Sequence, residues 1–473
     1  MVLIRLAVPA LAAALLYVYG LASVGVLSTD EPRYISIGRE MARSGDWITP
    51  RLWGQAWFEK PPLLYWLIAA ATRAGLRDEW AARLPVALMS LAFLAFYFRR
   101  LEREFGRAPA AYATVILGTS AGWLAYSRLA LTDIPMAAAL SAAMLFALRS
   151  EAGAGPLLGV AILAKSLVPA ILAAPLVWWG RRRPRDLLVV ALAATIVAAP
   201  WYVLCYARNG REFLDVLFVR HQLARFANGE MHPQPFWFYL PVLAAGLFPW
   251  TPLVPLLAAR QNWRDPVRRY FLIWAAFGFA FFSASSGKLP GYLLPILPPV
   301  AALLGVALDQ SRWPRVLLTA SLLVCLAATP VLVDSVAEVH NSGLSRAAIH
   351  IDLRQVVLWL TAALAIAITA IRGVPVPVAF RRVALAVVAV FAFSLPQINL
   401  ALDRESSVRL LWQTLIAPQR DLVCVEEIHR KWRYGLNYYS VDPLPACEVQ
   451  DRRLHLRQLE GSQKLELTAS PRE

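Results

Sequence analysis

Residues 28–62, STDEPRYISIGREMARSGDWITPRLWGQAWFEKPP, form a charged and aromatic stretch between apolar segments of the chain. Its charged residues are Asp30, Glu31, Arg33, Arg39, Glu40, Arg43, Asp46, Arg51, Glu59 and Lys60. Because a charge at membrane depth is costly, a charged loop beside a bilayer usually lies in water or lines a site. Acids and bases mixed in this way suit a site that deprotonates one group and holds an anion at a membrane surface.

The rest of the chain is too apolar for a soluble enzyme. Of its 473 residues, 58% are hydrophobic and 16% are charged, whereas about a quarter of the residues are charged in soluble domains. The net charge of +16 is explained by basic residues in cytoplasmic loops, and we find no nucleic-acid-binding motif. The composition predicts a polytopic α-helical membrane protein with the bilayer, and no nucleic acid, as its partner.

Apolar segments predict about 13 membrane helices, most of them long enough to cross a bilayer about 30 Å thick. These segments are residues 4–27, 83–98, 109–126, 131–148, 155–166, 167–179, 187–206, 236–258, 268–283, 289–308, 314–333, 355–372 and 383–401. Two of them, 155–166 and 167–179, are too short to cross and are expected to form a broken or re-entrant pair. Residues 62–76 are expected to form a helix on the membrane surface that begins at two prolines. We interpret the first segment as a signal anchor that is retained.

Arginine-rich loops predict the orientation of the chain. The loops at 99–107 and 181–186 are short and rich in arginine, which assigns them to the cytoplasm together with the N-terminus. The first loop, 28–82, and the polar tail then lie on the opposite face, which in a bacterium is the periplasm. We divide the chain into a transmembrane part, 1–402, and a small periplasmic α/β domain, 403–473, with the whole in the bacterial inner membrane.

The four cysteines fall into two classes. Cys205 and Cys325 lie in apolar segments and are interpreted as apolar filler. Cys424 and Cys447 share the predicted periplasmic tail, where a disulfide is expected because that compartment is oxidising. The alternative is a pair of free thiols.

Further charged residues recur in the turns that the predicted orientation places on the periplasmic face. They are Arg128 and Asp133 of SRLALTDIP, Lys165 between the two short segments, Arg220, His221, Arg225 and His232 of the loop at 207–235, and Lys288 of SSGKLP. Lysine is rare among the 47 basic residues, so a lysine beside an apolar segment suggests a specific use. Turns on one face can together line one cavity.

These residue types suit acid–base chemistry next to a phosphate. Two carboxylates, Asp30 and Asp133, can divide the work of a general base and of a group that orients the acceptor. Arginine and lysine side chains can clamp a leaving phosphate and stabilise its charge. Glu59 and His221 can hold a divalent metal, although two ligands from distant loops are a sparse set.

Each of these residues also has a simpler interpretation. Glu31 and Arg33 can form an ion pair on the surface. Asp133 can cap a helix, as aspartate often does. Arg39 and Arg43 have helical spacing and can lie on one solvated face.

Five motifs resemble the ArnT-like bacterial branch of the protein mannosyltransferase family. They are TDEPRYISIGREMARSGDWITPRLWGQAWFEKPPLLYW, SRLALTD, the AK of LAKSLVP, RHQLARF followed by QPFWFY, and GKLPGYLLPILPP, in the order of the family and within residues 5–310. The resemblance implies a GT-C fold, with many transmembrane helices and an active site in a periplasmic cavity. It also implies transfer of a sugar from undecaprenyl phosphate to an envelope glycan, most often 4-amino-4-deoxy-L-arabinose to lipid A.

The resemblance assigns roles to individual residues. Asp30 resembles the acidic residue at the catalytic centre, and Asp133 matches the second acidic position. The implied ligands of the carrier phosphate are Arg33, Lys60, Arg225 and Lys288. Glu59 and His221 resemble a pair that can bind a divalent metal, and no other cofactor is implied.

Two other functions stay open. A transporter or flippase of an amphipathic anion would use the same basic groups, but transporters usually have internal repeats and broken helices near the midplane, and this sequence has no repeat. A protein O-mannosyltransferase would share the fold and take a Ser or Thr acceptor, whereas FEKPP favours the aminoarabinose branch. The chain departs from the family where AKSLVP replaces TKGP, and it is shorter after residue 310. We expect the region after 310 and the tail to help recognise the acceptor.

Overall fold

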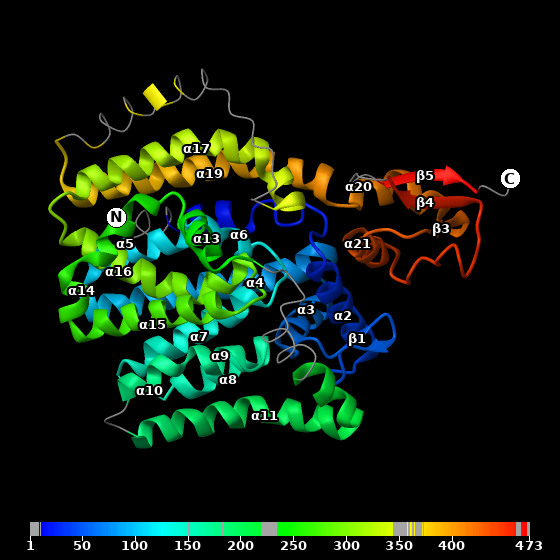
Figure 1. Ribbon diagram of the computed structural model, residues 1–473, viewed down its shortest axis with the longest axis horizontal. Helices are drawn as coiled ribbons and strands as arrows, with labels where there is room; N and C mark the ends of the chain where they lie inside the picture. The colour runs from blue at the N-terminus through cyan, green and yellow to red at the C-terminus, as the bar shows by residue number, and fades with distance from the viewer. Residues whose placement is uncertain are drawn as a thin grey trace.

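The computed structural model describes residues 9, 11–149, 152–180, 184–218, 234–343, 357, 360, 361, 364, 371, 373–459 and 465–470. Helices run along the long axis of the molecule, and a small unit with β-strands lies at one end of them (Figure 1). The helices of the bundle are α4 (Asp78–Phe105), α5 (Arg107–Gly118), α6 (Ala121–Ser127), α7 (Asp133–Ala147), α8 (Ala154–Lys165), α9 (Val168–Leu172), α10 (Ala174–Gly180), α11 (Pro184–Leu214), α13 (Tyr239–Gly246), α14 (Arg260–Arg264), α15 (Pro266–Ala284), α16 (Leu297–Asp309), α17 (Pro314–Ser342) and α19 (Val376–Ser406).

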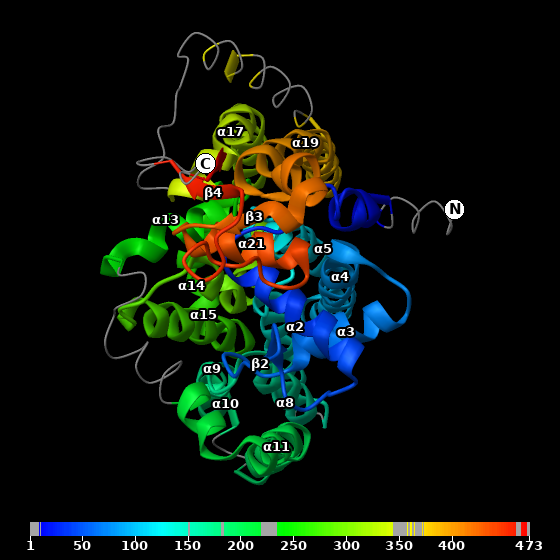
Figure 2. The ribbon, with the colours of Figure 1, turned by 90° about the vertical axis from the view of Figure 1, so that its right-hand side faces the viewer.

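The described helices have the length and composition of membrane spans. Five of them are long and apolar enough to cross a bilayer, and a sixth span is possible if one bent pair counts as a single span. In the span at Pro290–Asp309, 94% of the apolar 18-residue window is buried by its neighbours, whereas in the span at Pro184–Phe218 only 17% of that window is buried. An apolar helix that is covered on all sides belongs to the core, and one left uncovered suits contact with lipid. In the views of Figures 1 and 2, α11 lies at the opposite edge of the bundle from α17 and α19.

Some predicted spans are broken. The prediction of one helix at 236–258 is wrong, because Phe236–Gly246 and Thr251–Ala258 meet at an angle of 116°. Prolines at 249 and 252 explain the break, since proline lacks a backbone donor and clashes with the preceding turn. The predicted break between the two short segments is confirmed: α8 ends at Lys165 and Ser166 has a positive φ of 57°.

The first charged stretch, residues 28–62, folds into α2 (Asp30–Ser44) and the two-residue strands β1 (Arg51–Leu52) and β2 (Gln55–Ala56). Helix α3 (Leu63–Arg73) follows it directly. Helix α3 begins after Pro62, as the proline pair predicts. Helices α2 and α3 pack closely at Gly38, where an added Cβ would lie 2.6 Å from the side chain of Ile68. This contact holds the charged helix against the end of the bundle.

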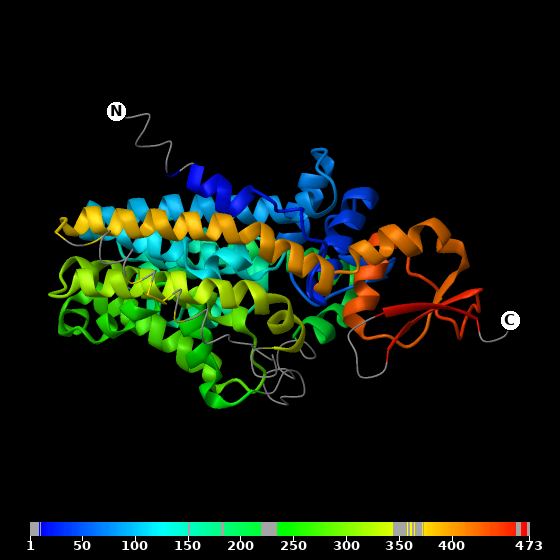
Figure 3. The same cartoon turned by 90° about the horizontal axis from the view of Figure 1, so that it is seen from above.

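The C-terminal unit has its own apolar core. It contains β3 (Val423–Val425), α21 (Arg430–Ser440), β4 (Leu454–Gln458) and β5 (Leu465–Ala469). The strand order is β3-β4-β5, with a parallel first pair and an antiparallel second pair. Its core includes Val423, Leu436 and Leu456. The expected disulfide between Cys424 and Cys447 is confirmed. Seen from above, the orange and red ribbon of this unit projects past the helices (Figure 3).

Candidate functional site

The predicted acids begin two helices at the same end of the bundle. Asp30 is the first residue of α2, Asp133 is the first residue of α7, and Lys165 is the last residue of α8. Lys165 pairs with Asp133 at 2.7 Å, and Glu31, the residue after Asp30, accepts from the backbone N–H of Ala130, three residues before Asp133. The three helix ends therefore bring both predicted acids to one place. Helix N-termini carry partial positive charge, which suits acidic side chains there.

Arg33 links the charges of the first stretch. Its guanidinium donates to the Asp30 carboxylate, to Glu59 at 2.5 Å and to the backbone oxygen of Thr29 at 2.9 Å. Glu59 is also 3.7 Å from the ammonium of Lys60. Burial opposes the charge of Arg33, but Glu59 and Asp30 outweigh it, so the pKa of Arg33 is raised. The structure thus brings together four of the residues predicted for the site.

The second acid, Asp133, is more buried than the first, Asp30. The Asp133 side chain is 14% exposed, whereas that of Asp30 is 37% exposed. The Lys165 ammonium also lies 4.8 Å from the ring centre of Tyr292. An added Cβ on Gly291, in the GKLPGY motif, would lie 2.9 Å from an oxygen of Asp133. This motif therefore packs directly against the second acid.

Lys288 of the same motif has different neighbours. It is buried and donates to the backbone oxygens of Ser285 and Gln234, the latter at 3.2 Å. In this structure its ammonium holds the turn together. The predicted residues Arg225 and His221 lie outside the described residues.

The described residues give little support to a metal at Glu59. Its carboxylate contacts two cations, Arg33 and Lys60, which is the arrangement of an ion pair. Among the described residues, one group of three His, Cys, Asp or Glu side chains is close enough to hold a metal: Cys424, Cys447 and His455. The two sulfurs form a disulfide, so they are not available as thiolate ligands.

His455 instead lies between two carboxylates of the C-terminal unit. Its Nδ1 is 2.8 Å from Glu426 and its Nε2 is 2.7 Å from Asp451. Burial lowers the pKa of His455, but the hydrogen bonds to Glu426 and Asp451 outweigh this effect, and the pKa is raised. This contact is far along the chain from the residues predicted for the site.

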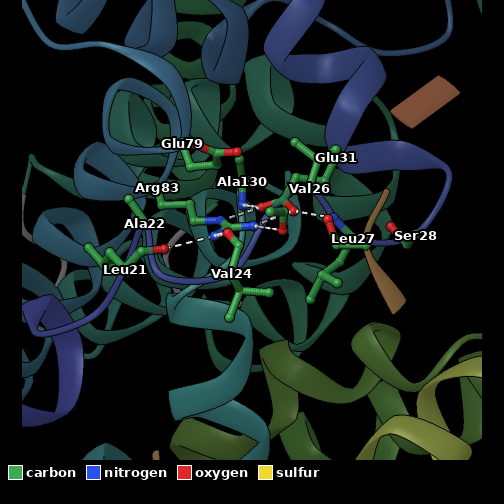
Figure 4. A network of polar contacts seen from close by, with 12 residues as sticks. Leu21, Ala22, Val24, Val26, Leu27, Ser28, Glu31, Glu79, Arg83 and Ala130 are labelled. Carbon is green, nitrogen blue, oxygen red and sulfur yellow. Dashed lines mark hydrogen bonds and ion pairs between the residues drawn. The ribbon is translucent and has the colours of Figure 1, made fainter. Parts of the chain in front are cut away.

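Sequence analysis missed the partner of Glu31. The interpretation of Glu31 and Arg33 as a surface pair is wrong: Glu31 is buried and pairs with Arg83 at 2.7 Å (Figure 4). Arg83 and Lys165 both lie at the ends of apolar segments. Their position in the sequence indicates that these two residues have a specific use, since an ionisable group at membrane depth needs a partner or a role.

The C-terminal unit also reaches the candidate site. The Arg33 guanidinium lies 5.2 Å from the ring centre of Tyr434 and 5.5 Å from that of Trp57. Arg39 donates to the backbone oxygen of Tyr438 at 2.8 Å, so the prediction of a solvated face is wrong for this residue. Helix α21 therefore packs on α2, as the end-on view shows (Figure 2).

Comparisons with known proteins point to one family. A family profile described as Dolichyl-phosphate-mannose-protein mannosyltransferase matches residues 2–157. The chain is similar to "Undecaprenyl phosphate-alpha-4-amino-4-deoxy-L-arabinose arabinosyl transferase 2" of Pseudomonas fluorescens, with 32% identity over 69% of this chain and 61% of that protein. It is 34% identical to a Pseudomonas aeruginosa protein of the corresponding name, over 63% of this chain and 58% of the relative. The matched region thus spans about three fifths of these relatives.

Solved structures extend the likeness to nearly the whole chain. The structure of ArnT from Cupriavidus metallidurans bound to undecaprenyl phosphate matches with a TM-score of 0.71 and 25% identity, covering 95% of this chain and 92% of that one. The apo structure of the same protein matches with a TM-score of 0.74 and 22% identity, over 97% and 92% of the two chains. The chain therefore has the GT-C fold of polytopic helical membrane proteins and is similar to ArnT-like proteins.

Proposed function

We propose that this protein transfers a sugar from undecaprenyl phosphate to an envelope acceptor. The favoured sugar is 4-amino-4-deoxy-L-arabinose or a close relative, and the favoured acceptor is lipid A. The observation that carries this proposal is the meeting of two acid–cation groups at one end of the bundle. One group joins Asp30, Arg33 and Glu59, and the other joins Asp133 and Lys165. The likeness to an ArnT whose structure was solved with undecaprenyl phosphate supports the carrier.

The exposure of the two acids suggests how they divide the work. Asp30 has the more accessible carboxylate, so we assign it the role of general base toward the acceptor hydroxyl. Asp133, held by Lys165, orients the acceptor or the sugar. In a single displacement the acceptor oxygen forms a bond to the anomeric carbon as the bond from that carbon to the phosphate oxygen breaks. The acceptor proton passes to Asp30, the phosphate leaves with the electron pair, and the anomeric configuration inverts.

Cations hold the leaving phosphate in this scheme. Arg33 is fixed by three acceptors and presents a charged fork, which suits a phosphate. Lys60 lies 3.7 Å from Glu59, at the long end of an ion pair, and can turn toward an anion. Arg225 and Lys288 complete the proposed set. For Lys288 this role requires the ammonium to leave its backbone acceptors.

A divalent metal at Glu59 and His221 stays a separate proposal. A metal there would share the Glu59 carboxylate with Arg33 and Lys60. The scheme above uses no metal.

The orientation and domain division are also proposals. We place the N-terminus in the cytoplasm, and the site and the C-terminal domain, 403–473, in the periplasm, with about 13 membrane helices in residues 1–402. The disulfide between Cys424 and Cys447 fits an oxidising compartment. The separate apolar core of the C-terminal unit supports treating it as a domain.

Protein O-mannosylation is the second candidate function, because the matching family profile carries a protein mannosyltransferase description. The two functions differ in the acceptor. Mass spectrometry of lipid A from a deletion strain, the complemented strain and a strain carrying Asp30→Asn separates them. We expect an aminoarabinose-sized increment only in the complemented strain. If lipid A is unchanged while a periplasmic protein loses a hexose, the second function replaces the first.

A further inference from the structure

The backbone that leads to Asp30 has no regular structure of its own. From residue 19 to residue 29 the chain forms only turns and extended segments, between the helical turn η1 (Ala14–Val18) and α2. Buried backbone groups need hydrogen-bond partners, and here side chains must supply them. Three carbonyls of this segment accept from one side chain, that of Arg83. They are the carbonyls of Leu21 at 2.7 Å, Val24 at 2.6 Å and Gly25 at 2.8 Å.

Arg83 and Glu31 satisfy each other's remaining groups. Arg83 donates from Nε to one oxygen of Glu31 at 2.8 Å and from Nη2 to the other at 2.7 Å. With the three carbonyls, all five N–H donors of the guanidinium are engaged. The side chains are 2% and 1% exposed. This is a fully satisfied buried ion pair rather than a chance contact.

The same carboxylate contacts the backbone that precedes each of the two candidate acids. One oxygen of Glu31 accepts from the backbone N–H of Leu27 at 2.8 Å, three residues before Asp30. The other accepts from the N–H of Ala130 at 2.9 Å, three residues before Asp133. Figure 4 shows Glu31 between these two backbone groups, with Arg83 beside it. A single carboxylate thus ties together the chain before α2 and the chain before α7.

The attraction between the two charges does not by itself account for such a pair. Apolar residues of similar volume often replace a buried ion pair with no loss of stability, because desolvation offsets the attraction of the charges. What a satisfied polar network does provide is one defined geometry. A site that uses two carboxylates from different helices needs that geometry, since a displacement of about 1 Å can lower a rate about 100-fold.

We propose that Glu31 and Arg83 are positioning residues that fix the starts of α2 and α7, and so hold Asp30 and Asp133 in register. Neither residue touches the substrates in this role. The role rests on the proposed function, in which the two acids act together on one acceptor.

The test compares the single variants Glu31→Gln and Arg83→Met with the double variant Glu31→Met/Arg83→Met. Arg100→Met is the matched control. Arg100 is a buried arginine of the same helix that donates to the backbone oxygen of Leu145 at 3.0 Å. It lies 17 residues along α4 from Arg83, which is about 25 Å. Steady-state transfer kinetics and thermal unfolding are measured on purified protein, with hydrogen exchange of residues 21–30 and 129–133.

In the single variants we expect kcat to fall about 100-fold, with a smaller change in the KM of the donor. The double variant removes the unpaired charge, so it should regain part of the lost thermal stability while kcat stays low. Hydrogen exchange should quicken in both segments together. Arg100→Met should lower thermal stability without changing kcat of the folded protein or exchange in either segment.

Recovery of kcat together with stability in the double variant would overturn the positioning role, because the pair would then serve folding alone. Faster exchange in only one of the two segments would overturn it as well. If the wild-type protein transfers no sugar from undecaprenyl phosphate donors, the proposed function fails. Hydrogen exchange still decides in that case whether the pair couples the two segments.

Discussion

The substitution Glu59→Gln tests what the first charged stretch does. It removes one negative charge and keeps nearly the same shape. If Glu59 serves as an ion-pair partner of Arg33, the amide oxygen can still accept a hydrogen bond from the guanidinium. If Glu59 serves as a metal ligand, the neutral amide is a much poorer ligand for a divalent ion. The two roles therefore predict losses of different size.

The contacts of Arg33 set the size expected for an ion pair. Arg33 donates to Glu59 at 2.5 Å, and it keeps its contacts with Asp30 and the Thr29 oxygen in the variant. A hydrogen bond between two charged groups contributes about 1.5–3 kcal/mol, and one from a charged donor to a neutral acceptor contributes at least the value of a neutral bond, about 1 kcal/mol. The difference of at most about 0.5–2 kcal/mol corresponds to a loss in kcat/KM of no more than about 2- to 30-fold.

The assay is transfer from a short-chain polyprenyl phosphate aminoarabinose to lipid A in detergent, with and without a chelator. The control is Glu104→Gln. Glu104 pairs at 2.6 Å with Arg149, whose side chain is 50% exposed, and exposed pairs contribute about 0–1 kcal/mol. We expect the chelator to leave the wild-type rate unchanged. A loss of more than about 1,000-fold in Glu59→Gln, together with a chelator-sensitive wild type, would refute the ion-pair role and support a metal.

Three further perturbations have defined outcomes. Lys165→Met should lower kcat about 100- to 1,000-fold, as for loss of one charge-stabilising donor. Lys165→Arg should recover part of the lost kcat. Equal kcat values for the two variants would contradict a role for the charge. Replacing both Cys424 and Cys447 by serine should destabilise the C-terminal unit by about 2–4 kcal/mol. The measurement is thermal unfolding, with the wild-type protein under reducing conditions as the control. A reduced wild-type protein as stable as the oxidised one would contradict this prediction. The pKa of His455 is raised in the folded state by its two carboxylate neighbours, so its contribution to stability should be complete below pH about 6.5. That contribution should be lost as the pH rises through the folded-state pKa, and His455→Gln should remove this pH dependence of the melting temperature.

Much of the candidate site is predictable because charges stand out in an apolar chain. Asp30, Arg33, Glu59 and Lys60 share one short stretch, and the structure joins them by ion pairs. A charge at membrane depth is costly, so a charged stretch beside apolar segments either lies in water or lines a site. The position of Asp133 follows from the same reasoning, since it closes a polar turn between apolar segments.

The partners of these charges are harder to predict because they depend on how helices meet. Arg83 stands 52 residues from Glu31 in sequence, and Lys165 stands 32 residues from Asp133. Helical spacing relates residues three or four positions apart, but nothing local relates these pairs. The prediction of Glu31 with Arg33 failed for this reason, because it chose the neighbour in sequence over the neighbour in space.

The segment before Asp30 shows why the membrane part and the C-terminal unit cannot be understood separately. Arg83 of the bundle holds three of its carbonyls, while Arg409 donates to the carbonyl of Ala22 at 2.8 Å and Tyr439 accepts from the N–H of Val26 at 3.1 Å. A helix would satisfy these backbone groups internally, but a helix continued through this segment could not turn to begin α2 at the bundle end. Side chains from both parts of the protein therefore replace the missing backbone bonds. Tyr434 lies on α21, the helix that also carries Tyr439, and its ring lies over Arg33. Movement of the C-terminal unit would therefore alter both the position of Asp30 and the surroundings of Arg33, the cation proposed to hold the phosphate.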